Sequence, residues 1–129
     1  MAELRFRRVT KAFDEDAGLF DFSVQVEQGQ AFGLLGPGGA GKSTALSLLM
    51  GFIRPDDGEV SIRGMDCFTQ RHVLMQYVGY VPRDARLPAR TTGDRFIRLL
   101  SAARGDTWRK RIQKLMERLD LNPLGDWAY

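Results

Sequence analysis

The amino-acid sequence predicts an α/β fold, and two observations support the prediction. Residues 30–35 read Gln-Ala-Phe-Gly-Leu-Leu, a short and nearly unbroken apolar run of the kind found in buried parallel strands. A glycine-rich segment follows at once, and residues 42–50 then have the character of a helix. A strand, a tight loop and a helix in immediate succession form an α/β unit.

Two further strands are expected ahead of this unit. Residues 4–6 begin an alternating strand, and residues 20–27 alternate apolar and polar side chains without a break. Such alternation is typical of a half-exposed antiparallel strand. Residues 14–18 read Asp-Glu-Asp-Ala-Gly and form the turn between them. The sequence therefore predicts an antiparallel β edge.

After the helix the pattern alternates between turns and short elements. Residues 54–58 are dense in turn formers, and residues 59–64 form another short alternating strand. Residues 69–76 read as a short helix. Residues 77–81 are a compact, β-prone apolar run that ends at a proline. We expect this last run to pair in the core beside the strand at 30–35.

Two amphipathic helices follow an irregular stretch, and Gly105-Asp106 separates them, with Asp106 as the expected N-cap. Their apolar stripes are Phe96, Ile97, Leu99, Leu100 and Ala103 on the first helix, and Trp108, Ile112, Leu115, Met116 and Leu119 on the second.

The opposite face of the second helix is basic, which raises the question of a nucleic-acid or anionic-lipid partner. Two acidic residues, Glu117 and Asp120, interrupt the run, which is typical of a face that is simply solvated. We therefore expect a solvated face, with neither a nucleic-acid nor a lipid partner there. The basic residues are Arg109, Lys110, Arg111, Lys114 and Arg118.

Composition narrows the class of protein. The 129 residues suffice for one domain or a piece of one, and a net charge of +3 permits a polyanionic ligand without requiring it. The single cysteine, Cys67, excludes an internal disulfide and a C-x-x-C site, and the single histidine, His72, excludes a multi-histidine metal cluster. The charged amino terminus lacks the apolar stretch of a secretion signal.

The segment at residues 36–44 is a complete G-x-x-x-x-G-K-[ST] phosphate-binding loop. Its glycines let the backbone curl so that successive N–H groups face phosphate oxygens. Lys42, the candidate catalytic residue, is expected to reach the β and γ phosphates, and the Ser43 hydroxyl to ligate Mg²⁺. The candidate nucleotide-binding residues of the loop are Gly36, Gly38, Gly39, Ala40, Gly41, Lys42, Ser43 and Thr44.

Three segments together resemble the nucleotide-binding subunit of an ATP-binding cassette (ABC) transporter, over its amino-terminal part. They are residues 34–44, residues 51–60 and the Val-Gly-Tyr-Val-Pro at residues 78–82. The resemblance implies a P-loop NTPase fold, with a partial core and an antiparallel β edge in an ATP-binding subdomain at 1–82. Residues 83–129 would then be a linker and the start of a truncated helical subdomain.

The resemblance also implies a function. ATP and Mg²⁺ would be the cofactors, and hydrolysis would be coupled to transmembrane transport. The partners would be a transmembrane permease and a second ATPase subunit, at the cytoplasmic, inner face of the cell membrane. Within the family, the glycine and turn patterns mildly favour the exporter-like branch.

Two residues outside the loop gain expected roles from the resemblance. Phe13 lies about two dozen residues before the loop, where family members place an aromatic ring that stacks on adenine. Arg83 follows Pro82, where the family usually has glutamine or glutamate. A guanidinium has no acceptor and cannot ligate Mg²⁺, so Arg83 is expected to weaken metal coupling or to contact phosphate directly.

Later family motifs are not found in these residues. No segment spells L-S-G-G-Q, no run of four apolar residues precedes an aspartate after the loop, and His72 lies too early to be the switch histidine. ATPase activity is therefore expected of a full-length parent, whereas this chain alone is expected to bind nucleotide without turnover.

The alternatives come from other classes. A soluble nucleotide-binding regulatory module of the same family remains open. A small kinase would place the loop after its first strand, and a GTPase would carry an N-K-x-D segment, which is not present.

Overall fold

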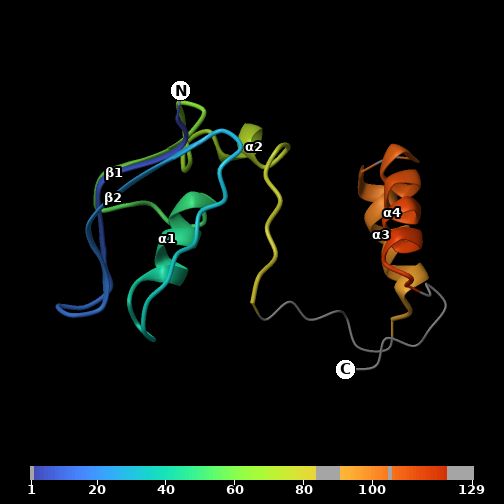
Figure 1. Ribbon diagram of the computed structural model, residues 1–129, viewed down its shortest axis with the longest axis horizontal. Coiled ribbons are helices and arrows are strands. Elements are labelled where there is room, and N and C mark those ends of the chain that lie inside the picture. The colour runs from blue at the N-terminus through green and yellow to red at the C-terminus, as the bar shows by residue number, and fades with distance from the viewer. Residues whose placement is uncertain (1, 84–90, 105, 122–129) are drawn as a thin grey trace. The chain divides into compact units, whose positions relative to one another are not determined.

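The structure is a computed structural model that describes residues 2–83, 91–104 and 106–121. The chain divides into two compact units, an N-terminal unit (Met1–Val81) and a C-terminal unit (Pro82–Tyr129). Figure 1 shows strands and helices in the first unit and a helical pair in the second.

A four-stranded antiparallel sheet forms one layer of the N-terminal unit. The strands β1 (Ala2–Ala12), β2 (Gly18–Glu27), β3 (Asp57–Ile62) and β4 (Met65–Asp66) lie in the order β2-β1-β3-β4. Every neighbouring pair is antiparallel. The predicted hairpin and the predicted strand after the loop helix are thereby confirmed.

The helix α1 (Lys42–Leu49) packs its inner side on this sheet, as Figure 1 shows. Residues three apart share a helix face, so Ala45 and Leu48 are both buried while Leu46 points outward. Phe6 of β1 meets Phe22 of β2 edge to face, with ring centroids 5.3 Å apart. The buried cluster comprises Phe6, Val9, Leu19, Ala45, Leu48, Val60, Cys67 and Leu74.

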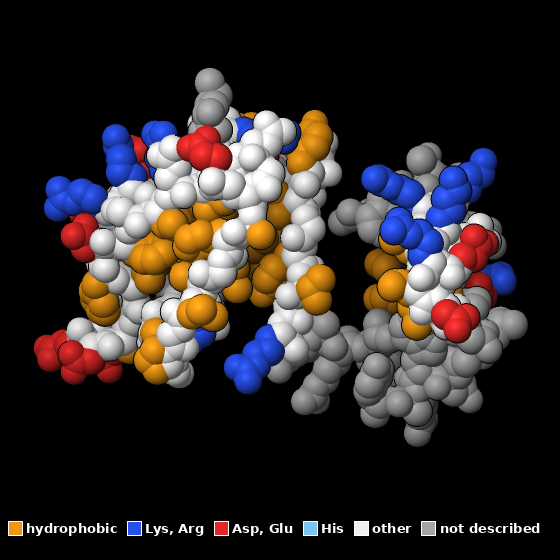
Figure 2. All heavy atoms as spheres, in the orientation of Figure 1, with side chains coloured by type: hydrophobic (Ala, Val, Ile, Leu, Met, Phe, Trp, Pro, Cys, Tyr) orange, Lys and Arg blue, Asp and Glu red, His pale blue; other side chains and the backbone are white. Residues whose placement is uncertain are grey.

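Two expected core strands are not formed, so those two predictions are wrong. Residues 30–35 and 77–81 are irregular, and no backbone hydrogen bond in the described part of the chain joins residues 31–35 to another segment. Leu35 is 93% and Val81 is 88% exposed, and Figure 2 shows hydrophobic side chains gathered on the visible face of this unit. A parallel strand needs hydrogen-bonded neighbours. The four described strands pair only with one another.

The helix α2 (Arg71–Leu74) falls within the predicted helix at residues 69–76. Asp66 Oδ1 accepts hydrogen bonds from the hydroxyl and the amide of Thr69, each at 2.7 Å. These bonds, the hydroxyl bond foremost, lower the pKa of Asp66. Cys67 is buried beside it, and burial, with a smaller contribution from the Asp66 charge, raises its thiol pKa to about 12. The thiol is therefore protonated at neutral pH and packs in the core.

Asp56 ties the turn before β3 to the end of β1. Its carboxylate accepts hydrogen bonds from Lys11 Nζ at 2.6 Å and from the Ala12 amide at 2.9 Å, and its own amide donates to the Thr10 carbonyl. The Lys11 bond first, and the Ala12 bond second, lower the pKa of Asp56 below its ordinary value of 3.8.

Because the pKa of Asp56 is lower in the folded protein than its ordinary value, the free energy of unfolding depends on pH. The contribution of Asp56 is fully present above its ordinary pKa and is lost as the pH falls through the lowered one. We expect Asp56→Asn to be less stable than wild type at pH 7 and the difference to shrink in acid. Urea unfolding followed by circular dichroism from neutral pH to pH 2 measures this. A difference that stays constant with pH would contradict the assignment.

The described part of the C-terminal unit contains α3 (Gly93–Arg104) and α4 (Asp106–Arg118), which confirms the two predicted helices. Met116 of α4 and Ser101 of α3 are buried. The side chains of Trp108 and of the expected N-cap, Asp106, lie outside the described residues.

In residues 2–83, 91–104 and 106–121, no helix has the length and hydropathy needed to cross a bilayer.

Candidate phosphate-binding site

The glycine-rich loop turns back on itself just before α1. Gly39 and Gly41 have φ of 81° and 80°, in the left-handed region that side chains disfavour. The Ala40 amide donates to the Pro37 carbonyl at 3.3 Å and closes the turn. Gly41 is the N-cap of α1, so the chain passes directly from the turn into the helix. The curl that the motif predicts is therefore present in the backbone.

The amides at this turn and in the first helical turn are free to bind an anion. Within the described residues, none of these amides donates a hydrogen bond. For the amides of the first helical turn the reason is general, since they have no partner carbonyl within the helix. The first turn of α1 also holds no acidic residue. Free donors and the positive end of the helix dipole together favour a bound anion. The amides are those of Gly38, Gly39, Gly41, Lys42, Ser43 and Thr44.

Lys42 directs its charge into the same loop. Its Nζ donates to the carbonyl oxygens of Gly36 at 2.6 Å and of Pro37 at 2.5 Å. Both acceptors are neutral, and no described carboxylate forms an ion pair with Lys42. The full ammonium charge is thus held against the loop backbone, where it adds to the field of the free amides.

The two hydroxyls of the motif begin the helix. Ser43 is exposed and Thr44 is half-buried. In the part of the chain that the structure describes, no three His, Cys, Asp or Glu side chains cluster as a metal site. Mg²⁺ prefers hard oxygen ligands and commonly binds through few protein groups together with phosphate oxygens and water. An exposed hydroxyl beside a phosphate cradle fits that donor set.

The loop is anchored on the start of β2. A methyl group at Gly41 would lie 2.7 Å from the Gly18 carbonyl oxygen and 3.0 Å from Leu19 Cδ1. The turn between β1 and β2 is thereby brought next to the phosphate loop. Phe13 lies on that turn, 63% exposed, with its amide donating to the Ala17 carbonyl at 2.8 Å. Arg83 is exposed and belongs to the C-terminal unit.

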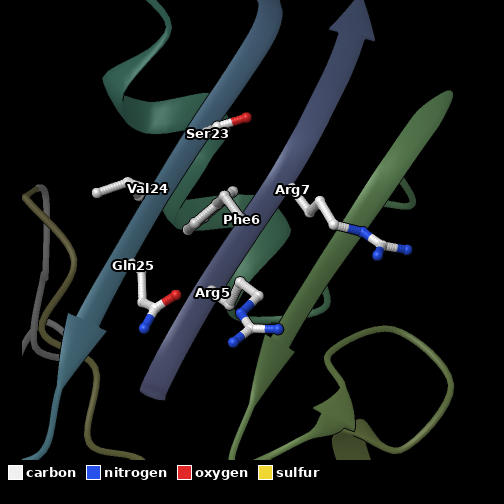
Figure 3. A pocket seen from close by; sticks show the side chains of 6 residues that line it. All are labelled: Arg5, Phe6, Arg7, Ser23, Val24 and Gln25. Carbon is white, nitrogen blue, oxygen red and sulfur yellow. The ribbon is translucent and has the colours of Figure 1, made fainter. Parts of the chain in front are cut away.

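A shallow hollow of 410 Å³ lies elsewhere, over the outer side of β1 and β2. Figure 3 shows the side chains that line it. On each of the two strands, two polar side chains flank one hydrophobic side chain, which is Phe6 on β1 and Val24 on β2. Arg7, which is one of the lining residues, forms a salt bridge with Glu59, with 3.0 Å between the guanidinium nitrogen and the carboxylate oxygen. None of the residues that the sequence motifs single out lines this hollow, and it has no recognisable chemistry of its own. The lining residues are Arg5, Phe6, Arg7, Ser23, Val24 and Gln25.

The chain is similar to known ATP-binding proteins. The Nod factor export ATP-binding protein I of Burkholderia thailandensis is 39% identical over 83 residues, which cover 64% of this chain and 27% of that protein. The probable multidrug ABC transporter ATP-binding protein YbhF of Escherichia coli is 30% identical over 125 residues, covering 95% of this chain and 22% of that protein. The chain thus spans about a quarter of the length of these curated relatives.

A solved structure of a bacterial Atm1-family ABC exporter with ATP bound is also similar. It shares 33% identity and has a TM-score of 0.64, over 72% of this chain and 17% of that one. The family model described as ABC transporter matches residues 19–128, nearly the whole chain. The α/β P-loop fold predicted from the sequence is thereby confirmed, and the chain belongs to the ABC transporter family of ATP-binding proteins.

Proposed function

We propose that residues 36–44 bind the triphosphate of Mg²⁺-ATP. The observation that carries the proposal is the set of free amides at the start of α1. The same loop holds the Lys42 ammonium, which is bonded only to neutral carbonyls and to no described carboxylate. On binding, Lys42 exchanges its two carbonyl acceptors for β and γ phosphate oxygens, which are stronger acceptors because they are charged. The matched exporter structure contains ATP, which supports this ligand.

The remaining residues have supporting roles in this proposal. The Ser43 hydroxyl ligates Mg²⁺, and Thr44 lies at the α phosphate. Phe13 stacks on adenine, which its exposure and its place on the turn next to the loop support. Arg83 takes the place of a metal-coordinating side chain and weakens Mg²⁺ coupling or contacts phosphate directly.

Transport is proposed at the level of the whole protein. The matched relatives are named for export and multidrug transport, so the parent protein couples ATP hydrolysis to transport with a permease and a second ATPase subunit, at the cytoplasmic side of the membrane. The 129 residues alone bind ATP without turnover, because phosphoryl transfer needs positioned charges beyond the phosphate cradle.

Lys42→Ala is expected to weaken Mg²⁺-ATP binding about tenfold to hundredfold. The reason is that a hydrogen bond from a charged donor contributes about 1.5–3 kcal/mol. Isothermal titration calorimetry measures the dissociation constant. The matched control is Arg5→Gln, which removes an exposed cation of the same unit away from the loop and should leave affinity unchanged. Equal affinity in wild type and Lys42→Ala would refute the proposal.

A further inference from the structure

One face of α4 carries cations that have no ion-pair partner among the described residues. Lys110, Arg111, Lys114 and Arg118 are exposed, and none lies within ion-pair distance of a carboxylate in the described residues. On α3, by contrast, Arg98 pairs with Asp94 at 2.7 Å. Successive residues advance about 100° around an α-helix. The four cations of α4 therefore fall within one side of the helix.

Exposed leucines border this basic side. Leu115 is 52% and Leu119 is 64% exposed, and both lie between the cations and the buried side that carries Met116. The acidic residue Glu117 falls on the opposite border, away from the leucines. In Figure 2, the Lys and Arg side chains of the C-terminal unit gather together, with hydrophobic side chains along one edge of the group.

The sequence alone predicts a merely solvated face, but the exposure of its leucines changes that interpretation. We propose that this basic-leucine face of α4 binds the surface of an anionic lipid bilayer directly. The face consists of Lys110, Arg111, Lys114, Leu115, Arg118 and Leu119.

Both halves of the face have a use at such a surface. Its cations meet anionic headgroups, and its leucines enter the boundary with the acyl chains. A nucleic-acid backbone would satisfy the cations but would leave Leu115 and Leu119 in water. The adjacency of unpaired charge and exposed leucine therefore favours lipid. No residue of the phosphate loop belongs to this face.

Co-sedimentation of the full chain with lipid vesicles tests the proposal. We expect binding to vesicles of phosphatidylcholine mixed with phosphatidylglycerol, little binding to phosphatidylcholine alone, and a decrease with added salt. Each near-surface cation contributes about fivefold to partitioning, so Lys110→Gln/Lys114→Gln/Arg118→Gln should weaken binding about a hundredfold. Arg5→Gln/Arg8→Gln/Arg54→Gln is the matched control: it lowers the net charge equally but lies in the N-terminal unit.

A second variant separates lipid from nucleic acid and does not rest on charge. Leu115→Ser/Leu119→Ser should weaken vesicle binding at least tenfold with the helical circular dichroism unchanged, because both side chains are already largely exposed. Equal losses in the two triple variants would show a net-charge effect and overturn the proposal. Vesicle binding that survives the leucine changes would also overturn it, as would salt-sensitive binding to poly-uridine RNA in place of vesicles.

Discussion

Replacing Leu48 with alanine is expected to lower the free energy of unfolding of the N-terminal unit by about 2–5 kcal/mol, the cost of deleting a large buried aliphatic side chain. Leu48 is 1% exposed and belongs to the buried cluster that joins α1 to the sheet. Small domains have a total stability of only about 5–15 kcal/mol. The change should therefore lower the urea midpoint markedly, or abolish the cooperative transition.

Leu46 supplies the matched control for this change. It belongs to the same helix and is chemically identical, but it is 45% exposed. Leu46→Ala should cost much less than Leu48→Ala, because little apolar surface returns to water and no cavity forms. Similar losses in the two variants would mean that α1 does not pack on the sheet with the face described.

The second large effect is expected at Gly41, where alanine should cost about 2–5 kcal/mol of stability. A left-handed backbone costs a residue with a Cβ about 1–2 kcal/mol, and forcing a contact into a packed site typically costs a further 1–3 kcal/mol, roughly. The added methyl would meet the backbone oxygen of Gly18, which cannot move without shifting β2. Nucleotide affinity should fall as well, since Gly41 begins the helix whose amides form the cradle.

Gly39 separates the two causes. Its φ of 81° matches that of Gly41, but no atom lies within 4 Å of an added Cβ. Gly39→Ala should therefore show the backbone cost alone, and the difference between the two variants in thermal or urea unfolding measures the contact with β2. If Gly41→Ala is no less stable than Gly39→Ala, the loop is not anchored on β2 as described.

The sequence predicts those features whose cause is local. Alternation between residues 20 and 27 marks a sheet with one buried face, and β2 occupies that segment. The phosphate motif requires a curled turn and a helix, and the turn ends at Gly41 with α1 beginning at Lys42. Nothing beyond nearby residues is needed in these cases.

The two wrong strand predictions have a cause that is not local in sequence. The apolar runs at 30–35 and 77–81 indicate a tendency to be buried, but a parallel strand also needs partner strands from elsewhere in a chain. Leu34 does pack against the core cluster, while Phe32 and Leu35 remain exposed. Likewise, the contact between Gly41 and Gly18 joins segments far apart in sequence, so no local pattern could have predicted it.

The basic-leucine face of α4 also combines features that the local sequence predicts with features that depend on tertiary packing. The sequence contains its charges, and periodicity assigns Leu115 and Leu119 to the apolar stripe that packs inward. In the structure both leucines are more than half exposed, whereas Met116 is buried. Which members of a stripe are covered depends on how the two helices pack, and this geometry is not encoded in the spacing.

The central claim is that backbone amides at the start of α1 hold the triphosphate of ATP, and the most direct test is an amide NMR titration of the isotope-labelled chain with Mg²⁺-ATP. The largest shift changes are predicted at Gly38, Gly39, Gly41, Lys42, Ser43 and Thr44, the amides free of hydrogen bonds in the described structure. Saturable ATP binding that leaves these six signals in place, and moves those of the hollow over β1 and β2 instead, would contradict the account.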